Sequence, residues 1–295
     1  MNKIKHITKC HLEHYRNENI FSLNVLCKAK RKVSKSKFIL LLALLLSLNF
    51  SFSQEENLGA LVTDRPDATE ASSTVGKGIL QFETGGLYES FEANNTKSEN
   101  YTFNTMLIRY GILDNLELRL GWDFVEGVTT VNGNKLDNVM SGLSPLLLGM
   151  KIDIAEENGC MPEIALIGHV FPVFSASADY RPEYTGIDFR LSLSHTLSEK
   201  SSIGYNIGAQ WGDDSPEAAA IYTVAYGYSF TEKFGMYAEL YGDLPEDSSA
   251  NHYWDAGFTY LVNNDLQLDA YFGTSITEGQ DLLIGLGLSY RVRKK

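Results

Sequence analysis

The sequence predicts an all-β protein, a single antiparallel transmembrane β-barrel of about twelve strands with short periplasmic turns and longer extracellular loops. Three observations predict it. From residue 78 onward, apolar and polar residues alternate with a period of two, the alternating segments are even in number, and the connections between them are alternately short and long.

The first 53 residues predict a secretory signal peptide. A long basic region precedes an unbroken apolar run, FILLLALLLSLNF, at residues 38–50. The run is shorter than the roughly 20 residues of a membrane-spanning helix, and it ends at the small-x-small triplet of residues 51–53. We expect cleavage before Gln54, and the length of the basic region leaves the true start of the chain open.

The charge of the remaining chain excludes some classes of function. Residues 1–53 hold 10 of the 25 basic and 2 of the 37 acidic residues, so 15 basic and 35 acidic residues remain, a formal net charge of −20. Nucleic-acid binding requires clustered basic side chains, so we expect no nucleic-acid partner. Only Cys160 lies beyond the signal peptide, and no zinc-type cluster of ligands occurs, so we expect no disulfide, metal or cofactor.

Residues 54–77 form a separate segment ahead of the barrel, which we assign to residues 78–295. The stretch TDRPDATEASSTVGKG contains Asp64, Arg65, Asp67 and Glu70, and Pro66 disfavours helix at the residue before it. We expect an extended segment that starts on the periplasmic side. Either it folds into the lumen as a plug, which we favour, or it lies across the periplasmic mouth.

Twelve alternating segments follow in order. Most are at least as long as the about 9 to 11 residues that a tilted membrane strand requires. In LELRLGWDFV, for example, Leu116, Leu118 and Leu120 share one face, and Glu117 and Arg119 share the other. The segments are residues 78–92, 99–112, 115–128, 139–154, 162–175, 184–197, 201–213, 217–230, 234–244, 251–262, 265–277 and 281–291.

The connections separate the two ends of the barrel. Short turns occur at LDN, LSEK, TEK and NND, and tyrosines beside several of them indicate an aromatic girdle at the membrane edge. Longer polar loops lie between, such as EANNTKSEN, VNGNKLDN and SASADYRPE. This layout predicts a monomer in the bacterial outer membrane, in contact with lipid and inserted by the outer-membrane insertion machinery.

The face opposite the apolar one predicts the lining of the lumen. Its charged residues are mixed in sign with an acidic excess, as in a selective conduit for a small solute. Alternatively, these residues form ion pairs that only stabilise the barrel. The acids are Glu83, Glu117, Asp123, Asp153, Asp188, Glu239, Asp255 and Asp269, and the bases are Arg109, Arg119, Lys151 and Arg190.

Catalytic motifs are weak. No G-x-S-x-G motif occurs, and the histidines beyond the signal peptide lie on separate segments. An outer-membrane hydrolase that uses His169 or His195 remains the least favoured alternative. The facing of His169 is open because its segment alternates poorly.

The segment ahead of the barrel resembles a known family. The stretch TDRPDATEASSTVGKGILQFETGGLYE resembles the N-terminal hallmark of the outer-membrane β-barrel family of transporters associated with the meta-pathway of phenol degradation (MetA-type), and YGILDNLELRLG resembles its turn repeats. The resemblance implies an outer-membrane protein, not an enzyme, that passes small, aromatic or hydrophobic solutes by diffusion. The matching residues are Thr63, Asp64, Arg65, Pro66, Asp67, Thr69, Glu70, Val75, Lys77, Gly78, Gln81, Glu83 and Gly85.

Two other features bear on this interpretation. Many outer-membrane barrels end on an aromatic residue that the insertion machinery recognises, but this chain continues past Tyr290 into RVRKK. A barrel that displays acidic loops for envelope integrity or adhesion, and transports nothing, is the alternative from the structural class. The sequence names no solute.

Overall fold

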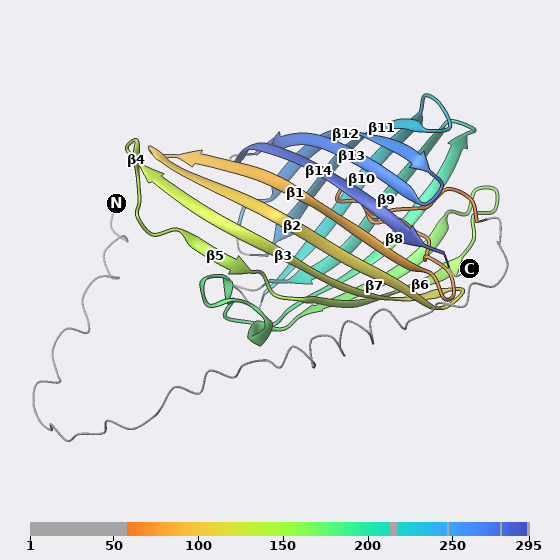
Figure 1. Ribbon diagram of the computed structural model, residues 1–295, viewed down its shortest axis with the longest axis horizontal. Coiled ribbons are helices and arrows are strands. Elements are labelled where there is room, and N and C mark those ends of the chain that lie inside the picture. Colours follow the sequence, from red (N-terminus) through yellow and green to blue (C-terminus); the bar gives the residue numbers. More distant parts are fainter. Residues whose placement is uncertain (1–57, 213–216, 247, 278, 294–295) are drawn as a thin grey trace, which may run out of the picture. The chain divides into compact units, whose positions relative to one another are not determined.

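The computed structural model describes residues 58–212, 217–246, 248–277 and 279–293. The expected signal peptide lies outside the described residues. Within them, the strands from Leu80 to Val292 form one closed antiparallel sheet (Figure 1). None of the helices in this part of the chain is long and apolar enough to cross a membrane.

Fourteen strands of the described chain make twelve crossings of the barrel wall. β5 and β6 both pair with β3 and together make one crossing, and β4 is a two-residue strand that pairs only with the tip of β3. The strands are β1 (Leu80–Ala93), β2 (Thr96–Leu113), β3 (Leu116–Val131), β4 (Asn134–Lys135), β5 (Met140–Leu143), β6 (Leu147–Ala155), β7 (Glu163–Phe171), β8 (Gly186–Ser198), β9 (Ser201–Trp211), β10 (Ala218–Ser229), β11 (Phe234–Pro245), β12 (Asn251–Asn263), β13 (Leu266–Ser275) and β14 (Gln280–Val292).

The sheet closes because its first and last strands pair. β1 lies between β2 and β14, with Leu80 opposite both Tyr110 and Val292, and from β6 to β14 each strand pairs with the next along the chain. The predicted closed antiparallel barrel of twelve strands is therefore confirmed. Closure leaves few backbone groups in need of other partners, and on the free side of β5 the N–H groups of Ser141 and Leu143 donate to Asp179 and Ser177.

One predicted segment is interrupted. We expected a continuous strand over residues 139–154, but β5 ends at Leu143 and β6 begins at Leu147. Pro145 lies between them and has no N–H to donate to a ladder. The next break in the wall's regularity also follows a proline, since the short 3-10 helices Val173–Ser175 and Ala178–Tyr180 come after Pro172.

The connections differ between the two ends of the barrel. The turn end carries residues 114–115, 156–162, 199–200, 230–233 and 264–265, and the loop end carries residues 94–95, 132–139, 172–185, 212–217, 246–250 and 276–279. The prediction of a long loop at EANNTKSEN is wrong. β1 and β2 continue through it to a two-residue turn at Asn94 and Asn95, whose φ angles of 51° and 60° suit a tight hairpin.

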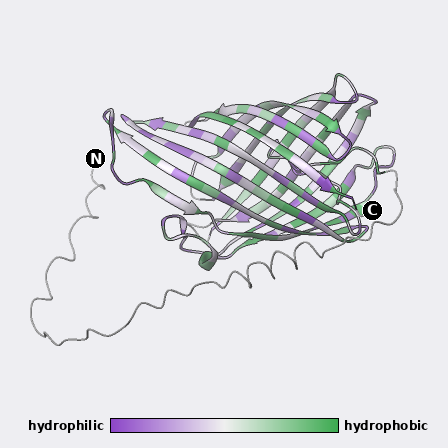
Figure 2. Ribbon diagram, viewed as in Figure 1, coloured by the Kyte–Doolittle hydropathy of each residue, from purple (hydrophilic) through white to green (hydrophobic). Residues whose placement is uncertain are grey.

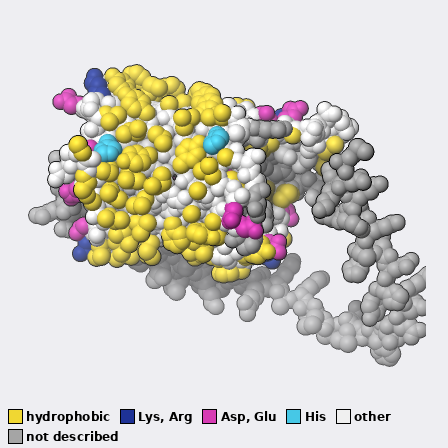
Figure 3. Space-filling view, turned by 180° about the vertical axis from the view of Figure 1, so that it is seen from behind, with side chains coloured by type: hydrophobic (Ala, Val, Ile, Leu, Met, Phe, Trp, Pro, Cys, Tyr) yellow, Lys and Arg dark blue, Asp and Glu magenta, His cyan; other side chains and the backbone are white. Residues whose placement is uncertain are grey.

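The two faces of the wall are those that the alternation predicts. Leu118 and Phe124 of β3 are exposed on the outside, whereas Glu117 and Arg119 are buried inside. Figure 2 shows the alternation along the strands, and Figure 3 shows apolar side chains covering the outer wall. Such an apolar band is the surface that lipid requires.

Residues 58–79, which we call the strap, run inside the barrel ahead of β1 (Figure 1). Both ends of the strap lie at the turn end. The N–H of Leu61 donates to the carbonyl of Asn264 at 2.9 Å, and that of Gly78 donates to the carbonyl of Gly111 at 2.8 Å. Between these points the strap arches through the lumen.

Candidate functional site

The strap is held by its backbone as well as by its side chains. The N–H of Asp64 donates to Glu83 at 3.0 Å, that of Ala68 to Glu239 at 2.7 Å, and that of Val75 to Glu117 at 2.9 Å. The strap forms no strand in the described chain, so its buried N–H groups need side-chain acceptors. Part of the acidic excess on the inner wall therefore binds the strap.

Wall side chains also bind carbonyl groups of the strap. Arg109 donates to the carbonyl of Ser73 at 3.0 Å, and Lys151 donates to that of Ala71 at 2.8 Å. Asn206 is bidentate, because it accepts from the N–H of Glu70 and donates to its carbonyl. Hydrogen bonds to the strap come from β1, β2, β3, β6, β7, β8, β9, β10, β11, β13 and β14.

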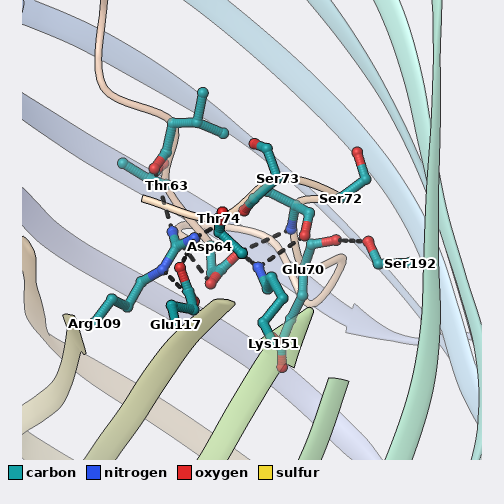
Figure 4. Close-up of polar contacts among 12 residues, drawn as sticks. Thr63, Asp64, Glu70, Ser72, Ser73, Thr74, Arg109, Glu117, Lys151 and Ser192 are labelled. Carbon is teal, nitrogen blue, oxygen red and sulfur yellow. Dashed lines mark hydrogen bonds and ion pairs between the residues drawn. The ribbon is translucent and has the colours of Figure 1, made fainter. Parts of the chain in front are cut away.

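Asp64 is the centre of the largest ion-pair network of the described chain (Figure 4). Its carboxylate lies 2.7 Å from Arg119, 2.8 Å from Lys151 and 3.3 Å from Arg109. Burial alone would raise the pKa of Asp64, but these three cations hold that pKa well below its usual value. The carboxylate is therefore ionised, and it ties the strap to β2, β3 and β6.

One further wall residue and a second strap carboxylate extend this network. Glu117 lies 2.9 Å from both Arg109 and Arg119. Glu70 of the strap lies 2.7 Å from Arg119, which also binds Asp64. Each buried charge thus has an opposite partner, which is the condition for keeping ionised groups away from water.

Arg65 binds the adjoining part of the wall, formed by β2, β1, β14 and β13. Its guanidinium lies 3.0 Å from Asp269, donates to Thr105 at 3.0 Å, and is 5.9 Å from the centroid of the Tyr271 ring. Gly85 and Gly287 lie directly behind it, and a side chain at either position would overlap the guanidinium. The wall therefore has a socket, made of two glycines and three polar residues, into which Arg65 fits.

Asp67 has a different environment. It lies beside Glu239 and Asp255, and no ion pair joins it to a basic residue in the described part of the chain. Burial, and next the neighbouring carboxylate of Glu239, raise the pKa of Asp67 well above its usual value. The strap thus places one carboxylate among cations and another among acids, three residues apart.

The strap divides the lumen into two cavities. The outer cavity, toward the loop end, has a volume of about 620 Å³ and is lined by residues that include Trp122, Phe171 and Trp211. The inner cavity, toward the turn end, has a volume of about 320 Å³ and is lined largely by hydroxyl-bearing residues. Arg65 and Asp67 line both, so these two residues form the partition.

The structure brings most of the predicted site residues together through the strap. Arg109, Glu117, Arg119 and Lys151 share one network, whereas Asp269 on β13 pairs with Arg65. The remaining wall residues occupy separate positions. Glu83 and Glu239 accept from the strap backbone, Asp153 contacts Thr74 near the turn end, Asp188 and Arg190 pair with each other, Asp255 lies beside Asp67, and Asp123 lines the outer cavity.

Several residues that bind the strap were not predicted. They are uncharged or were not assigned to a face, yet they lie in the same inward phase as the charged residues. Alternation alone could have found the polar ones. They are Gln81, Glu163, Ser192, Ser194, Thr223 and Gln267.

The histidines occupy different environments. His169, whose facing was open, is buried inside the barrel with its Nδ1 atom 2.9 Å from Asp188. His195 belongs to the turn end of β8, near Tyr205 and Glu157. Among the described residues, no group of three or more potential ligands could hold a metal ion.

Comparison with known proteins agrees with the fold. A family model described as "Putative MetA-pathway of phenol degradation" matches residues 63–292. An outer membrane channel from Pseudomonas putida F1 is similar in structure, with a TM-score of 0.58 and 11% sequence identity over 75% of this chain and 98% of that chain. The search of curated proteins found no match.

Other solved structures are more distantly similar. The NanC porin has a TM-score of 0.47 and 8% identity over 72% of this chain and 100% of its own. The CymD monoaromatic hydrocarbon channel has a TM-score of 0.41 and 9% identity over 74% of this chain and 89% of its own. At these identities the likeness to solved structures concerns the fold, which is that of outer-membrane channels.

Proposed function

The chain belongs to the family described as "Putative MetA-pathway of phenol degradation", and from this premise we propose that it is a monomeric outer-membrane channel for small solutes. Aromatic and hydrophobic molecules are among these solutes, and they cross by passive diffusion. The turn end faces the periplasm and the loop end faces outward, as in other outer-membrane barrels.

The partitioned lumen is the observation that carries this proposal. A cavity of about 620 Å³ is large enough for a small aromatic molecule, and both aromatic and charged side chains line it. A second cavity lies on the other side of the strap. Arg65 and Asp67 of the strap line both cavities, and the strap is held largely by side-chain contacts rather than by pairing in the sheet.

The strap also favours a second candidate, a closed barrel that only stabilises or decorates the envelope. Buried ion pairs on three sides of Asp64 fill much of the lumen in the described structure. If they never release the strap, no solute crosses. The two candidates differ in conductance alone, which makes them separable.

Planar-bilayer recording on the purified full-length protein tests the proposal. We expect discrete conductance events from the native protein and a larger, steadier conductance after residues 54–76 are removed. Cys160→Ala is the matched control, because this free, exposed side chain lies in the connection between β6 and β7 and lines neither cavity. A native protein and a strap-deleted protein that both insert without any conductance or solute flux would overturn the channel in favour of the closed barrel.

A further inference from the structure

The partition between the two cavities consists of two side chains of opposite formal charge, and only one of them is already bound to a wall residue of opposite charge. Arg65 and Asp67 both line the outer and the inner cavity, so a solute that crosses must pass them. Arg65 already binds Asp269 and Thr105 and rests on the ring of Tyr271. Its positive charge is therefore neutralised by the wall.

Asp67 has no basic partner among the described residues, so the wall does not neutralise its carboxylate once it is ionised. No basic residue of the described chain forms an ion pair with it, and the neighbouring wall adds the carboxyl groups of Glu239 and Asp255. Glu239 accepts from the N–H of Ala68 and from the hydroxyl of Thr69, which fixes it beside the strap. Three acids thus lie together at the partition between the two cavities.

Two unsatisfied polar groups point to a ligand at this position. The hydroxyl of Tyr237 and the Oδ1 atom of Asp255 lie near each other but form no well-aligned hydrogen bond with any described residue, although the two residues are only 6% and 2% exposed. Tyr237 lines the inner cavity beside Asp67. Buried polar atoms normally have partners, so unpaired oxygen atoms next to an acidic cluster suit a ligand that carries positive charge or donates hydrogen bonds.

We propose that Asp67, with Glu239, Asp255 and Tyr237, is a transit site for small cations and hydrogen-bond donors, and that Asp67 determines the charge selectivity of the channel. Cationic and neutral solutes, such as aromatic amines and phenols, cross this site, and carboxylate anions of the same size are rejected. The inference rests on the proposed function, since selectivity requires passage.

The formal charge of the outer cavity also favours cations over anions. Its lining includes three arginines and six carboxylates, a formal excess of three negative charges. A cleft of one sign with low-dielectric walls concentrates counter-ions. Rings of acidic side chains select cations in other pores for the same reason.

The test measures the reversal potential of the full-length protein in a planar bilayer under a KCl gradient, together with the permeabilities of an aromatic ammonium ion and an aromatic carboxylate ion, at an alkaline pH at which Asp67 is ionised. We expect potassium to be preferred over chloride, and the ammonium ion over the carboxylate. Asp67→Asn should reduce the cation-to-anion permeability ratio by roughly fivefold. Asp67→Glu should retain most of the preference, because it keeps the charge.

The matched control is Asp137→Asn, an exposed carboxylate at the loop end. Its effect should be small because water and salt screen it. Conductance without cation preference, or an Asp67→Asn protein with an unchanged ratio, overturns the inference alone. Absence of all conductance overturns the proposed function and the inference together. The reversal potential does not depend on how often the channel opens, so a change in strap release cannot imitate the expected result.

Discussion

At the scale of single residues, the strap carries two aspartates whose pKa values shift in opposite directions. Burial opposes ionisation of both. At Asp64, the cations Arg109, Lys151 and Arg119 outweigh burial and lower the pKa, whereas at Asp67 the carboxylate of Glu239 adds to burial and raises it. The strap therefore responds to pH at two separate points.

The signs of these shifts predict the pH dependence of the strap. The stabilisation from Asp64 is present above its unfolded pKa and is lost as pH falls through its lowered folded pKa. The contribution of Asp67 is present at low pH and is lost as pH rises through its raised folded pKa, when its charge meets those of Glu239, Asp255 and Asp64. Over the range from the ordinary pKa of an aspartate up to the raised pKa of Asp67, channel opening should thus increase with pH.

Single-channel recording across this range measures the effect as open probability. In Asp67→Asn the rise with pH should be flattened, since the group that titrates is absent. The same flattening should not occur in Asp137→Asn, whose carboxylate is exposed at the loop end. An open probability that is independent of pH in the native protein would contradict this assignment.

Sequence reasoning identified the residues of this site but not their partners. The phase of alternation predicts that Arg109, Glu117 and Arg119 point inward, because a strand alternates strictly between two faces. It does not predict that Asp64 meets Arg119 while Asp67 meets Glu239, since neither contact follows from spacing along the chain. The distances depend on how an irregular segment folds inside the closed barrel.

At the scale of elements, glycines in β1 and β14 make room for the strap. Gly85 and Gly287 lie behind Arg65, and a Cβ atom at Gly287 would overlap its guanidinium. The guanidinium is flexible, but moving it separates Arg65 from Asp269. β1 and β14 thus contribute to the partition because these two glycines have no side chain in the space that Arg65 occupies.

Gly287→Ala should weaken the seating of the strap. Overpacking of this kind costs about 1 to 3 kcal/mol, so we expect a lower thermal unfolding midpoint and more frequent channel opening. Circular dichroism on heating and single-channel recording measure the two effects. Gly168→Ala is the matched control, because a Cβ atom there meets only the ring of Phe189 at an ordinary 3.5 Å. Equal behaviour of the two variants would show that the socket does not hold Arg65.

The elements themselves were largely predictable, with two exceptions that have physical reasons. The number and order of the wall strands follow from alternation and turn residues. The break between β5 and β6 follows from Pro145, which cannot donate to a ladder. Whether such a proline interrupts a strand depends on the strand beside it, which here is β3. The extension of β1 and β2 through polar residues depends on their pairing with each other beyond the apolar band.

At the scale of the whole molecule, the closed sheet predicts the behaviour of a membrane barrel in detergent. Apart from the short β4 and β5, which pair only with β3, every strand has hydrogen-bonded neighbours on both sides, so almost no edge is available from which the sheet can unravel. We expect the protein to fractionate with membranes and to migrate faster on a detergent gel when it is not boiled. Recovery in the soluble fraction, with a single position before and after boiling, would contradict the membrane barrel.

The fold class was predictable at this scale because one face of nearly every segment is apolar, and a soluble sandwich would need polar outer faces. The strap could be identified as a segment ahead of the barrel, since Pro66 and its dense charges distinguish it from the strands. Its path along most of the wall could not be predicted. That path depends on acceptors that lie on many strands, each far away in the sequence.

The strap also constrains the order in which the protein can assemble. It precedes every strand in the chain, yet Arg65 binds Asp269 across 204 residues, and Arg291 near the chain's end donates to the carbonyl of Gly59 across 232. Contacts between residues this far apart in sequence form late in folding, because a long loop must close before they can be made. We therefore expect the strap to become fully ordered only when β14 pairs with β1, which brings Arg291 and Arg293 to the carbonyls of Gly59 and Leu58.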